Sequence, residues 1–238
     1  MYDEKYFFEL LTQKREISEP LCAMDGNEIT SRRTVAASAL AASYLARPDS
    51  KRLLVVGAGR VASLTAEAMS VVLKQLELVE VWNVFPQEAE ALVARLTSLG
   101  FKAKVSKDLK SSAEQADVIS CATLSTAPLI MASWLKPGCH VDLIGSFTPA
   151  MTEVEPACLA KAAVFVDTLE AVQKSGDVLN AVKAKLFDPA KDLRGTLADL
   201  ARGEKPGRKS PAEITLFKSV GTALEDLAAA ELVFDSKL

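Results

Sequence analysis

The sequence predicts an α/β protein with a doubly wound parallel sheet of the Rossmann type and a split second domain that is incomplete. The first observation is an apolar run, Arg52–Val56, that leads directly into the pattern Gly57-Ala-Gly-Arg-Val-Ala62 and then into a helical pattern. The second is that short apolar strands and helices alternate from there as far as Asp167. Strands separated by helices are joined by right-handed crossovers into a parallel sheet.

The glycine turn predicts a dinucleotide-binding site. A strand of consecutive branched apolar residues is typical of a parallel sheet, which is buried on both faces. Gly57 and Gly59 let the chain turn sharply, so that backbone N–H groups approach a pyrophosphate at the amino end of a helix. Ala62, in the third position of the pattern, keeps that helix close to the strand. The alternative is a glycine-rich packing turn with no ligand.

The composition is that of a globular protein and excludes several classes of partner. The chain has 238 residues, of which 49% are apolar and 25% charged, with a formal net charge of -3. This charge produces no long-range field that would attract nucleic acid or an anionic membrane. No run of about 18 apolar residues occurs, and the first residues lack the apolar core of a signal peptide. We expect no nucleic-acid or membrane partner and a cytoplasmic location.

The cysteines and the single histidine do not predict a metal site. His140 is the only histidine, and no Cys-x-x-Cys pair occurs. We therefore expect no metal ion and reduced, mostly buried thiols. Cys121 is a poor candidate nucleophile because no motif places a histidine to activate it. The four cysteines are Cys22, Cys121, Cys139 and Cys158.

Segment 1–49 is predicted to be the remnant of a dimerisation and substrate domain. Tyr6–Leu11 and Leu21–Met24 resemble the two strands of a hairpin. Thr30 or Ser31 is the predicted cap of a helix over Arg33–Tyr44.

Segment 50–175 is predicted to be the dinucleotide-binding domain. Pro86 is expected in the first turn of its helix, where proline is favoured. The predicted strands are Arg52–Val56, Leu78–Trp82, Lys102–Val105, Val118–Cys121, His140–Ile144 and Ala163–Asp167, and the predicted helices are Val61–Lys74, Pro86–Leu99, Leu109–Ala116 and Pro156–Lys161.

Segment 176–238 is predicted to be helical and to return to the first domain. The helical patterns beyond Asp167 lie at Thr168–Ser175, Lys191–Ala201 and Thr222–Val233, and 203–209 is a polar connection. Ile214–Phe217 is either a strand or an extended link to the last helix. This tail is too small for a domain of its own, so we expect it to complete a split second domain with segment 1–49.

Ligands of open α/β sheets bind beyond the carboxyl ends of the strands. Asn83 follows the second strand, where an acidic residue would bind the ribose 2′-hydroxyl of NAD. An asparagine does not repel a 2′-phosphate and Arg60 can neutralise one, so NAD(P) is expected with a slight preference for NADP(H). Alternatively, Asn83 is only a turn residue. Thr123, among small residues after the fourth strand, can hydrogen-bond a nicotinamide ribose, and the segment 145–153 can line the pocket of the ring.

Arg33 is the candidate for binding an anionic group. It stands in Arg32-Arg33-Thr34 at the expected amino end of a helix, where the helix dipole disfavours a cation. Binding a carboxylate or a phosphate would explain an arginine there. The alternative is a solvated pair of arginines.

Six segments that occur in order resemble the ornithine cyclodeaminase/mu-crystallin family. They extend the resemblance from about residue 7 to the carboxyl terminus. The segments are Met24–Ala39, Val55–Gly59, Ala116–Thr123, Ile144–Pro149, Val166–Ala171 and Phe217–Asp226.

The resemblance implies a homodimer with a Rossmann domain, a nicotinamide cofactor and a small imino- or amino-acid substrate. It implies that Arg33 contacts both the cofactor and the substrate carboxylate. Arg60 and Val61 would lie at the pyrophosphate, Asn83 at a ribose and Thr123 at the nicotinamide ribose. The remaining implied contacts are Ile144 and Gly145 beside the nicotinamide ring, Ser219 at the cofactor and Val220 at the substrate.

Two departures from the family pattern affect the expected activity. The catalytic aspartate of the cyclodeaminases falls on Phe147, and the segment that carries the family's catalytic lysine is not in this chain, so no catalytic residue is assigned. We expect a truncated member whose intact form is a cyclic imino-acid reductase of the pyrroline-2-carboxylate type. The alternatives are a non-catalytic NAD(P)-binding protein and an ornithine cyclodeaminase that forms proline and ammonia.

Overall fold

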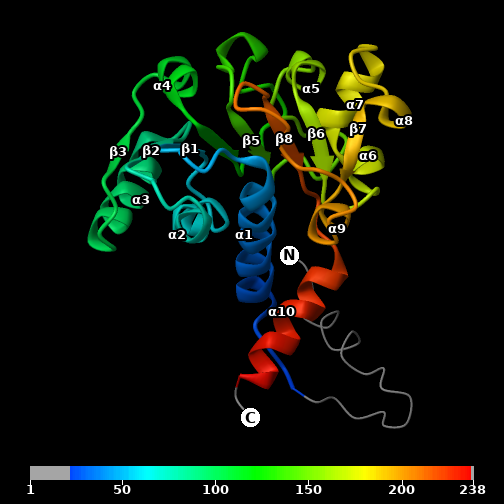
Figure 1. Ribbon diagram of the computed structural model, residues 1–238. Coiled ribbons are helices and arrows are strands. Elements are labelled where there is room, and N and C mark those ends of the chain that lie inside the picture. The colour runs from blue at the N-terminus through cyan, green and yellow to red at the C-terminus, as the bar shows by residue number, and fades with distance from the viewer. Residues whose placement is uncertain (1–21, 237–238) are drawn as a thin grey trace, which may run out of the picture.

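An eight-stranded parallel sheet organises the part of the chain that the structure describes, residues 22–236 of a computed structural model (Figure 1). The strand order is β3-β2-β1-β4-β5-β8-β6-β7. The predicted α/β fold with a parallel sheet is therefore confirmed. The strands are β1 (Arg52–Val56), β2 (Leu78–Trp82), β3 (Ala103–Val105), β4 (Val118–Cys121), β5 (His140–Leu143), β6 (Ala163–Val166), β7 (Leu193–Thr196) and β8 (Thr215–Lys218).

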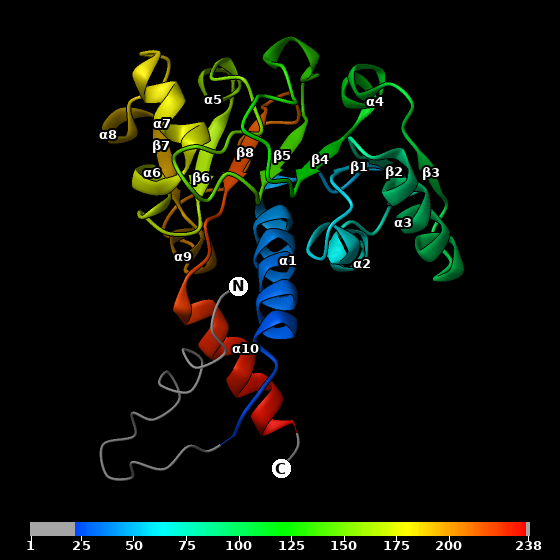
Figure 2. The same cartoon turned by 180° about the vertical axis from the view of Figure 1, so that it is seen from behind.

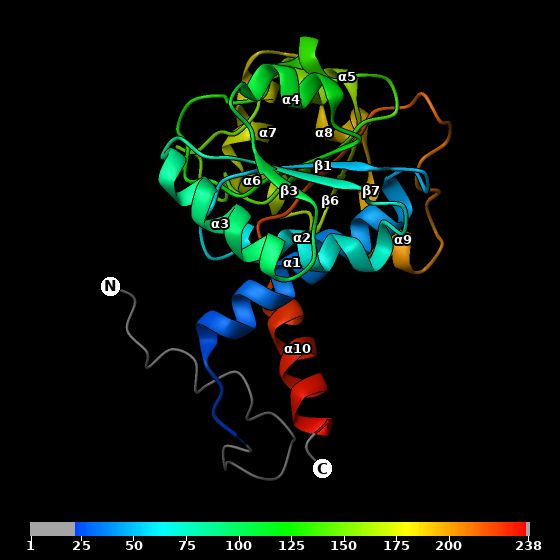
Figure 3. The same ribbon diagram turned by 90° about the vertical axis from the view of Figure 1, so that its left-hand side faces the viewer.

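Helices cover both faces of this sheet. Figure 3 shows α4, α5 and α7 on one face and α1, α2 and α3 on the other. The helices are α1 (Gly26–Leu45), α2 (Ala62–Val72), α3 (Pro86–Ser98), α4 (Leu109–Gln115), α5 (Ala157–Lys161), α6 (Ala171–Lys174), α7 (Gly176–Lys183), α8 (Pro189–Asp192), α9 (Leu197–Ala201) and α10 (Ala223–Asp235), and a short 3-10 helix lies at Ala132–Trp134.

Strand β1 lies at the point where the strand order reverses. Its last residue, Val56, pairs with Trp82 of β2 on one side and with Cys121 of β4 on the other. The chain proceeds outward from β1 through β2 to β3, and then returns to β4 and continues through β5. The carboxyl ends of β1 and β4 thus form the switch point at which ligands of such sheets bind.

The carboxyl-terminal segment was predicted to be helical, but it also contains strands β7 and β8. The segment 214–217, left open between strand and link, falls largely in strand β8, which lies between β5 and β6 with Leu216 and Phe217 fully buried. The helix predicted over Lys191–Ala201 is wrong at β7, because Gly195 and Thr196 favour an extended chain over a helix interior. Thr196 then caps α9 through a capping box with Asp199.

Two further helix predictions need correction. The helix predicted at Thr168–Ser175 is shorter, since α6 covers only Ala171–Lys174, and α7, which follows after Ser175, was not predicted. Helix α1 begins at Gly26 and not near Thr30, because the Asp25 side chain accepts hydrogen bonds from the backbone N–H groups of Asn27 and Glu28.

The predicted amino-terminal hairpin is not found where it can be examined. Residues 22–24 have no regular structure, so the strand at Leu21–Met24 is wrong for those residues. The strand at Tyr6–Leu11 lies outside the described residues.

The central helix in Figures 1 and 2, α1, contacts the carboxyl-terminal helix α10. Its carboxyl-terminal residues Ala41 and Leu45 pack in one apolar cluster with Phe165 and Phe217 of the sheet. Its other end lies beside α10, which extends away from the sheet. The division into domains at residues 49 and 175 stays a prediction, although α1 and strands β7 and β8 belong to the same packed body as the sheet.

The polar connection between α9 and β8 is fastened by Arg208. Its guanidinium donates hydrogen bonds to the Leu45 carbonyl (2.7 Å), the Thr215 hydroxyl (2.9 Å) and the Cys139 carbonyl (3.3 Å). These groups belong to α1, β8 and the start of β5. One half-buried cation therefore ties three elements together.

We predict that Arg208→Met lowers the free energy of unfolding by about 2–4 kcal/mol, because hydrogen bonds to a charged group are lost and buried carbonyls are left unpaired. Urea denaturation measures the change. The matched control is Arg202→Met, whose ion pairs with Asp199 and Glu204 lie at the surface and which should change stability much less. Equal effects of the two changes would contradict the assignment.

Candidate functional site

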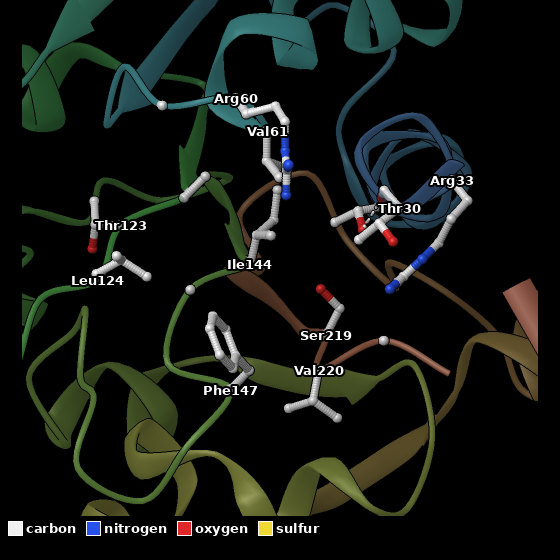
Figure 4. A pocket seen from close by; sticks show the side chains of 15 residues that line it. Thr30, Arg33, Arg60, Val61, Thr123, Leu124, Ile144, Phe147, Ser219 and Val220 are labelled. Atoms are coloured by element: carbon white, nitrogen blue, oxygen red, sulfur yellow. Dashed lines mark hydrogen bonds between the residues drawn. The ribbon is translucent and has the colours of Figure 1, made fainter. Parts of the chain in front are cut away.

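A cavity of about 520 Å³ opens at the carboxyl ends of the central strands, at the switch point (Figure 4). Its walls come from the segments that follow β1, β4, β5 and β8, and from one face of α1. The lining residues are Thr30, Arg33, Thr34, Gly59, Arg60, Val61, Ala122, Thr123, Leu124, Ile144, Gly145, Phe147, Ser219, Val220 and Gly221.

The turn after β1 is shaped by close backbone packing. Gly57 has φ +114°, and a Cβ atom there would lie 2.6 Å from the Ala122 carbonyl oxygen. Only glycine suits this position. Val61, which precedes the first residue of α2, makes no side-chain capping bond. The Ser63 and Leu64 N–H groups donate to the backbone carbonyls of Gly59 and Val61, whereas the Ala62 N–H has no hydrogen-bond partner within residues 22–236. This end of the cavity is suited to a phosphate or pyrophosphate.

Arg60 leaves the turn towards α1. Its Nη1 atom donates a 2.5 Å hydrogen bond to the Asn27 side chain. This contact holds a cation at the edge of the cavity, next to the amino end of α2 (Figure 4).

Arg33 is held by two carboxylates from the other end of the chain. Its Nε atom lies 2.8 Å from Asp226 and its Nη1 atom 2.8 Å from Glu225, both in α10. Burial raises the pKa of Glu225. Gly221, with φ +81°, leaves room for the guanidinium, since a Cβ atom there would lie 2.6 Å from Nη1.

The remaining terminal nitrogen of Arg33, Nη2, donates no hydrogen bond within residues 22–236, and the guanidinium is directed towards the side of the cavity where Ser219 lies (Figure 4). Nη2 is therefore available for an anionic ligand group. The sequence missed both carboxylate partners, because no local pattern connects residues 192 and 193 positions apart.

Thr123 is fixed from behind by a buried carboxyl group. The Oε1 atom of Glu153 accepts hydrogen bonds from the Thr123 backbone N–H (2.7 Å) and from its hydroxyl (2.9 Å). Burial raises the pKa of Glu153 to about 7. The sequence indicated only that the segment 145–153 is near the site.

A buried lysine supports the wall formed by Ile144 and Gly145. Lys218 is fully buried, and its Nζ atom donates to the carbonyl oxygens of Leu143 (3.0 Å) and Gly145. The Nζ atom also lies 4.0 Å from the Oδ2 atom of Asp177. The other carboxylate oxygen of Asp177 accepts hydrogen bonds from the backbone N–H groups of Glu153 and Val154. The loop that lines the cavity is thus anchored by charges outside it.

The opposite wall of the cavity is apolar. Phe147, Leu124 and Val220 present their side chains to it (Figure 4), and Phe147 is 46% exposed. This wall can accept the hydrocarbon part of a small ligand.

Of the remaining predicted site residues, Gly57 and Ala62 shape the turn without lining the cavity. Asn83 is also outside the lining, and its amide donates to the Glu88 carboxylate (2.6 Å), as a turn residue can. All the other residues predicted to bind cofactor or substrate line the cavity, and their roles as ligand contacts stay predictions. Thr30 and Thr34 were missed, although Thr30 lies three positions before Arg33 and four before Thr34, a spacing that makes it a neighbour of both on the helix surface.

The side chains of His140 and Cys121 lie outside the cavity lining and are fully buried. His140 is fully buried beside the Thr215 hydroxyl (3.0 Å), and burial lowers its pKa to about 3. Burial raises the pKa of the fully buried Cys121 thiol well above its ordinary value, so this thiol is not an activated nucleophile. Within residues 22–236 no group of three or more His, Cys, Asp or Glu is arranged to hold a metal ion, and no helix is long and apolar enough to cross a membrane.

The parallel sheet, the glycine turn into α2 and the cavity at the switch point define a Rossmann-type α/β protein with a ligand site of the dinucleotide-binding kind. A family model sharpens this class. The chain belongs to the ornithine cyclodeaminase/mu-crystallin family, whose model matches residues 8–238.

Individual relatives agree with this membership. The chain is 44% identical over 223 residues to an uncharacterized protein of Schizosaccharomyces pombe, with 90% of this chain and 67% of the relative covered. It is 39% identical over 211 residues to a delta(1)-pyrroline-2-carboxylate reductase of Paracoccus denitrificans, covering 88% and 66%. The Thermococcus litoralis delta(1)-pyrroline-2-carboxylate reductase, solved with NADH and L-proline, superposes with a TM-score of 0.89 at 32% identity, covering 93% and 68%. The chain thus spans about two thirds of the length of these relatives.

We predict that stability falls as the pH rises because of Asp142 beneath the site. Burial raises the pKa of Asp142 from 3.8 to about 6. The folded state therefore holds this proton more tightly than the unfolded chain, and the resulting stabilisation is complete below about pH 4 and lost as the pH rises through about 6.

Asp142→Asn should remove this part of the pH dependence, which amounts to roughly 2–3 kcal/mol at 1.36 kcal/mol per pKa unit. Urea denaturation at several pH values between about 4 and 8 measures it. Asp235→Asn, at an exposed position, serves as the control. A variant at position 142 that keeps the wild-type pH dependence would show that Asp142 does not titrate in this range.

Proposed function

We propose that the protein is an NAD(P)-dependent reductase of a cyclic imino acid of the pyrroline-2-carboxylate type. The observation that carries this proposal is one cavity that combines the amino end of α2, the guanidinium of Arg33 and an apolar wall. The relatives from Paracoccus denitrificans and Thermococcus litoralis that are named as such reductases support the choice of substrate.

The proposed cofactor half of the cavity begins at the glycine turn. Gly57 and Gly59 allow the close approach of a pyrophosphate, and Arg60 adds a positive charge. The nicotinamide end would lie against Thr123 and the loop of Ile144 and Gly145, with Ser219 beside it. When bound, the reduced nicotinamide supplies the hydride.

We further propose a preference for NADP(H) over NAD(H). Asn83 carries no charge that would repel a 2′-phosphate, and Arg60 can neutralise one. This preference is independent of the proposed substrate.

The proposed substrate half depends on Arg33 and the apolar wall. The free Nη2 atom of Arg33 can donate to the carboxylate of an imino acid. Phe147 and Val220 can contact the hydrocarbon ring and exclude water from it. Hydride addition to the imine carbon requires that the ring be held in attack geometry against the nicotinamide, which is the work these residues would do. The proton that must reach the ring nitrogen has no donor assigned among the described residues.

We also propose a homodimer in the cytoplasm, with segments 1–49 and 176–238 contributing to a second domain. Family resemblance supports the dimer, and the contact of α10 with α1 supports the association of the two segments.

Two alternatives are distinguished by particular residues. A non-catalytic NAD(P)-binding protein is supported by the absence of an acidic residue from the described cavity lining. An ornithine cyclodeaminase is disfavoured by Phe147, because phenylalanine cannot carry a proton at the position where that activity needs a carboxylate.

The decisive experiment is an assay of NADPH and NADH consumption with Δ1-pyrroline-2-carboxylate, followed by absorbance. We expect the protein to consume the reduced cofactor with this substrate and to form proline. Cofactor binding without turnover would support the non-catalytic alternative. Release of ammonia from ornithine with formation of proline would support the cyclodeaminase.

Gly57→Ala should weaken NADPH and NADH binding by more than about tenfold, equivalent to 1.4 kcal/mol, because the added Cβ atom displaces the turn from the Ala122 carbonyl. Fluorescence titration measures the dissociation constants. Gly100→Ala is the matched control, since Gly100 also has a positive φ of +89° but nothing within 4 Å of an added Cβ atom. If both variants bind like the wild type, the pyrophosphate does not lie at this turn.

A further inference from the structure

Glu153 is a fully buried carboxyl group that does not line the cavity but contacts it through Thr123. Both the backbone N–H and the hydroxyl of Thr123 donate to the same oxygen, Oε1. The other oxygen, Oε2, is buried and has no hydrogen-bond partner within residues 22–236. On the cavity side, Gly145 lies so close that a Cβ atom there would collide with this carboxyl group.

These contacts determine what the Thr123 hydroxyl can offer to a ligand. A hydroxyl has one hydrogen to donate and two lone pairs to accept. The hydrogen of Thr123 points to Glu153, and one lone pair is approached by the Ser125 backbone N–H at 3.3 Å. The hydroxyl therefore faces the cavity as an acceptor only.

We propose that Glu153 is a positioning residue that orients the Thr123 hydroxyl as an acceptor for a hydroxyl donor on the bound cofactor, such as the nicotinamide ribose, and strengthens that bond through its negative charge. The proposal rests on the proposed function, since it assumes that an NAD(P) cofactor occupies the cavity. Bonds that involve an ionised group are about twice as strong as bonds between neutral groups, and a carboxylate behind a hydroxyl makes the hydroxyl oxygen a better acceptor.

Charged groups from several elements surround Glu153. Lys218 of β8 stabilises its ionised form, whereas Asp177 of α7 and burial oppose it. Asp142 of β5 and the Cys121 thiol of β4 share the same buried region. Burial, aided by the charge of Asp177, outweighs the attraction of Lys218, so Glu153 retains a proton at higher pH than an exposed glutamate and its pKa is raised to about 7.

Only one carboxyl oxygen of Glu153 is available to take up a proton. Oε1 already accepts two hydrogen bonds, so protonation occurs at Oε2, which has no partner within the described part of the chain. The Thr123 contacts thus survive protonation while the charge behind them is lost. A fall in pH from about 8 to about 6 should weaken cofactor binding without disturbing the fold.

The experiment is a fluorescence titration of NADH and of NADPH with the full chain across this pH range. NADPH carries a 2′-phosphate whose own pKa is near 6. Comparing variants at equal pH with the same cofactor removes this titration from the comparison. Glu153→Gln keeps an acceptor for both Thr123 contacts but has no charge. The matched control is Glu155→Gln, whose carboxylate accepts a bond from the Ala132 backbone N–H (2.9 Å) away from the cavity lining.

We expect the wild-type dissociation constant to rise roughly two- to threefold as the pH falls, because the cofactor hydroxyl bonds to the neutral Thr123 oxygen and the charge of Glu153 strengthens that bond only by a fraction. Glu153→Gln should bind weakly and without this pH dependence at every pH, and Glu155→Gln should follow the wild type. Thr123→Val should also bind weakly, and adding Glu153→Gln to it should cost little more, because the two residues act through one bond.

Three results would overturn the inference. Wild-type-like affinity and pH dependence in Glu153→Gln would show that its charge does not reach the ligand. Additive losses in the double variant would show that Glu153 does not act through Thr123. A wild type that binds neither NADH nor NADPH would overturn the proposed function and the inference together, whereas the first two results leave the proposed function standing.

Discussion

The contact between Gly57 and the backbone of Ala122 is the constraint on which the site depends. Strands β1 and β4 are neighbours, and Val56 pairs with Cys121 at their ends. The two chains therefore leave the sheet side by side, and the missing side chain of Gly57 lets them stay in contact for one more residue. Beyond that contact they separate: one enters α2, and the other continues into the loop of Thr123 and Leu124. The cavity is the space between these two paths, so its position follows directly from the strand order.

The wall of the cavity is stabilised by charged side chains that do not themselves line the cavity. Lys218, Asp177, Asp142 and Glu153 are all fully buried between the sheet and the loops after β4 and β5. Burying charges is unfavourable unless they are paired and hydrogen-bonded. Here the lysine is bonded to two carbonyl oxygens, and Asp177 accepts several backbone and side-chain bonds. These bonds offset the cost of burial and hold the backbone of the loop in one conformation. The proposed hydride transfer would require such a fixed surface beneath a bound nicotinamide.

Strands β1 to β6 could be predicted because each is a short apolar run between helical patterns, and the glycine turn predicted a ligand site where residues of this turn do line a cavity. The predictions failed where distant contacts decide the structure. Nothing local reveals that β8 lies between β5 and β6 or that Arg33 pairs with Glu225 and Asp226. The cap of α1 is a different case, because Asp25 contacts only its neighbours Asn27 and Glu28 and was a local signal that the prediction at Thr30 passed over. Likewise, Glu153 has no sequence signature, since its role depends on a loop that brings it behind Thr123.

The pairing of Arg33 has a consequence for ligand recognition. One guanidinium faces two carboxylates, so the three side chains together carry a net negative charge when all are ionised. An incoming carboxylate on Nη2 adds a further negative charge to this cluster, and like charges in a low-dielectric site repel. Burial raises the pKa of Glu225, so this residue takes up a proton more readily than an exposed glutamate, which would relieve the repulsion. Because Glu225 belongs to α10 and Arg33 to α1, the proposed recognition of an anionic ligand would involve both of these helices.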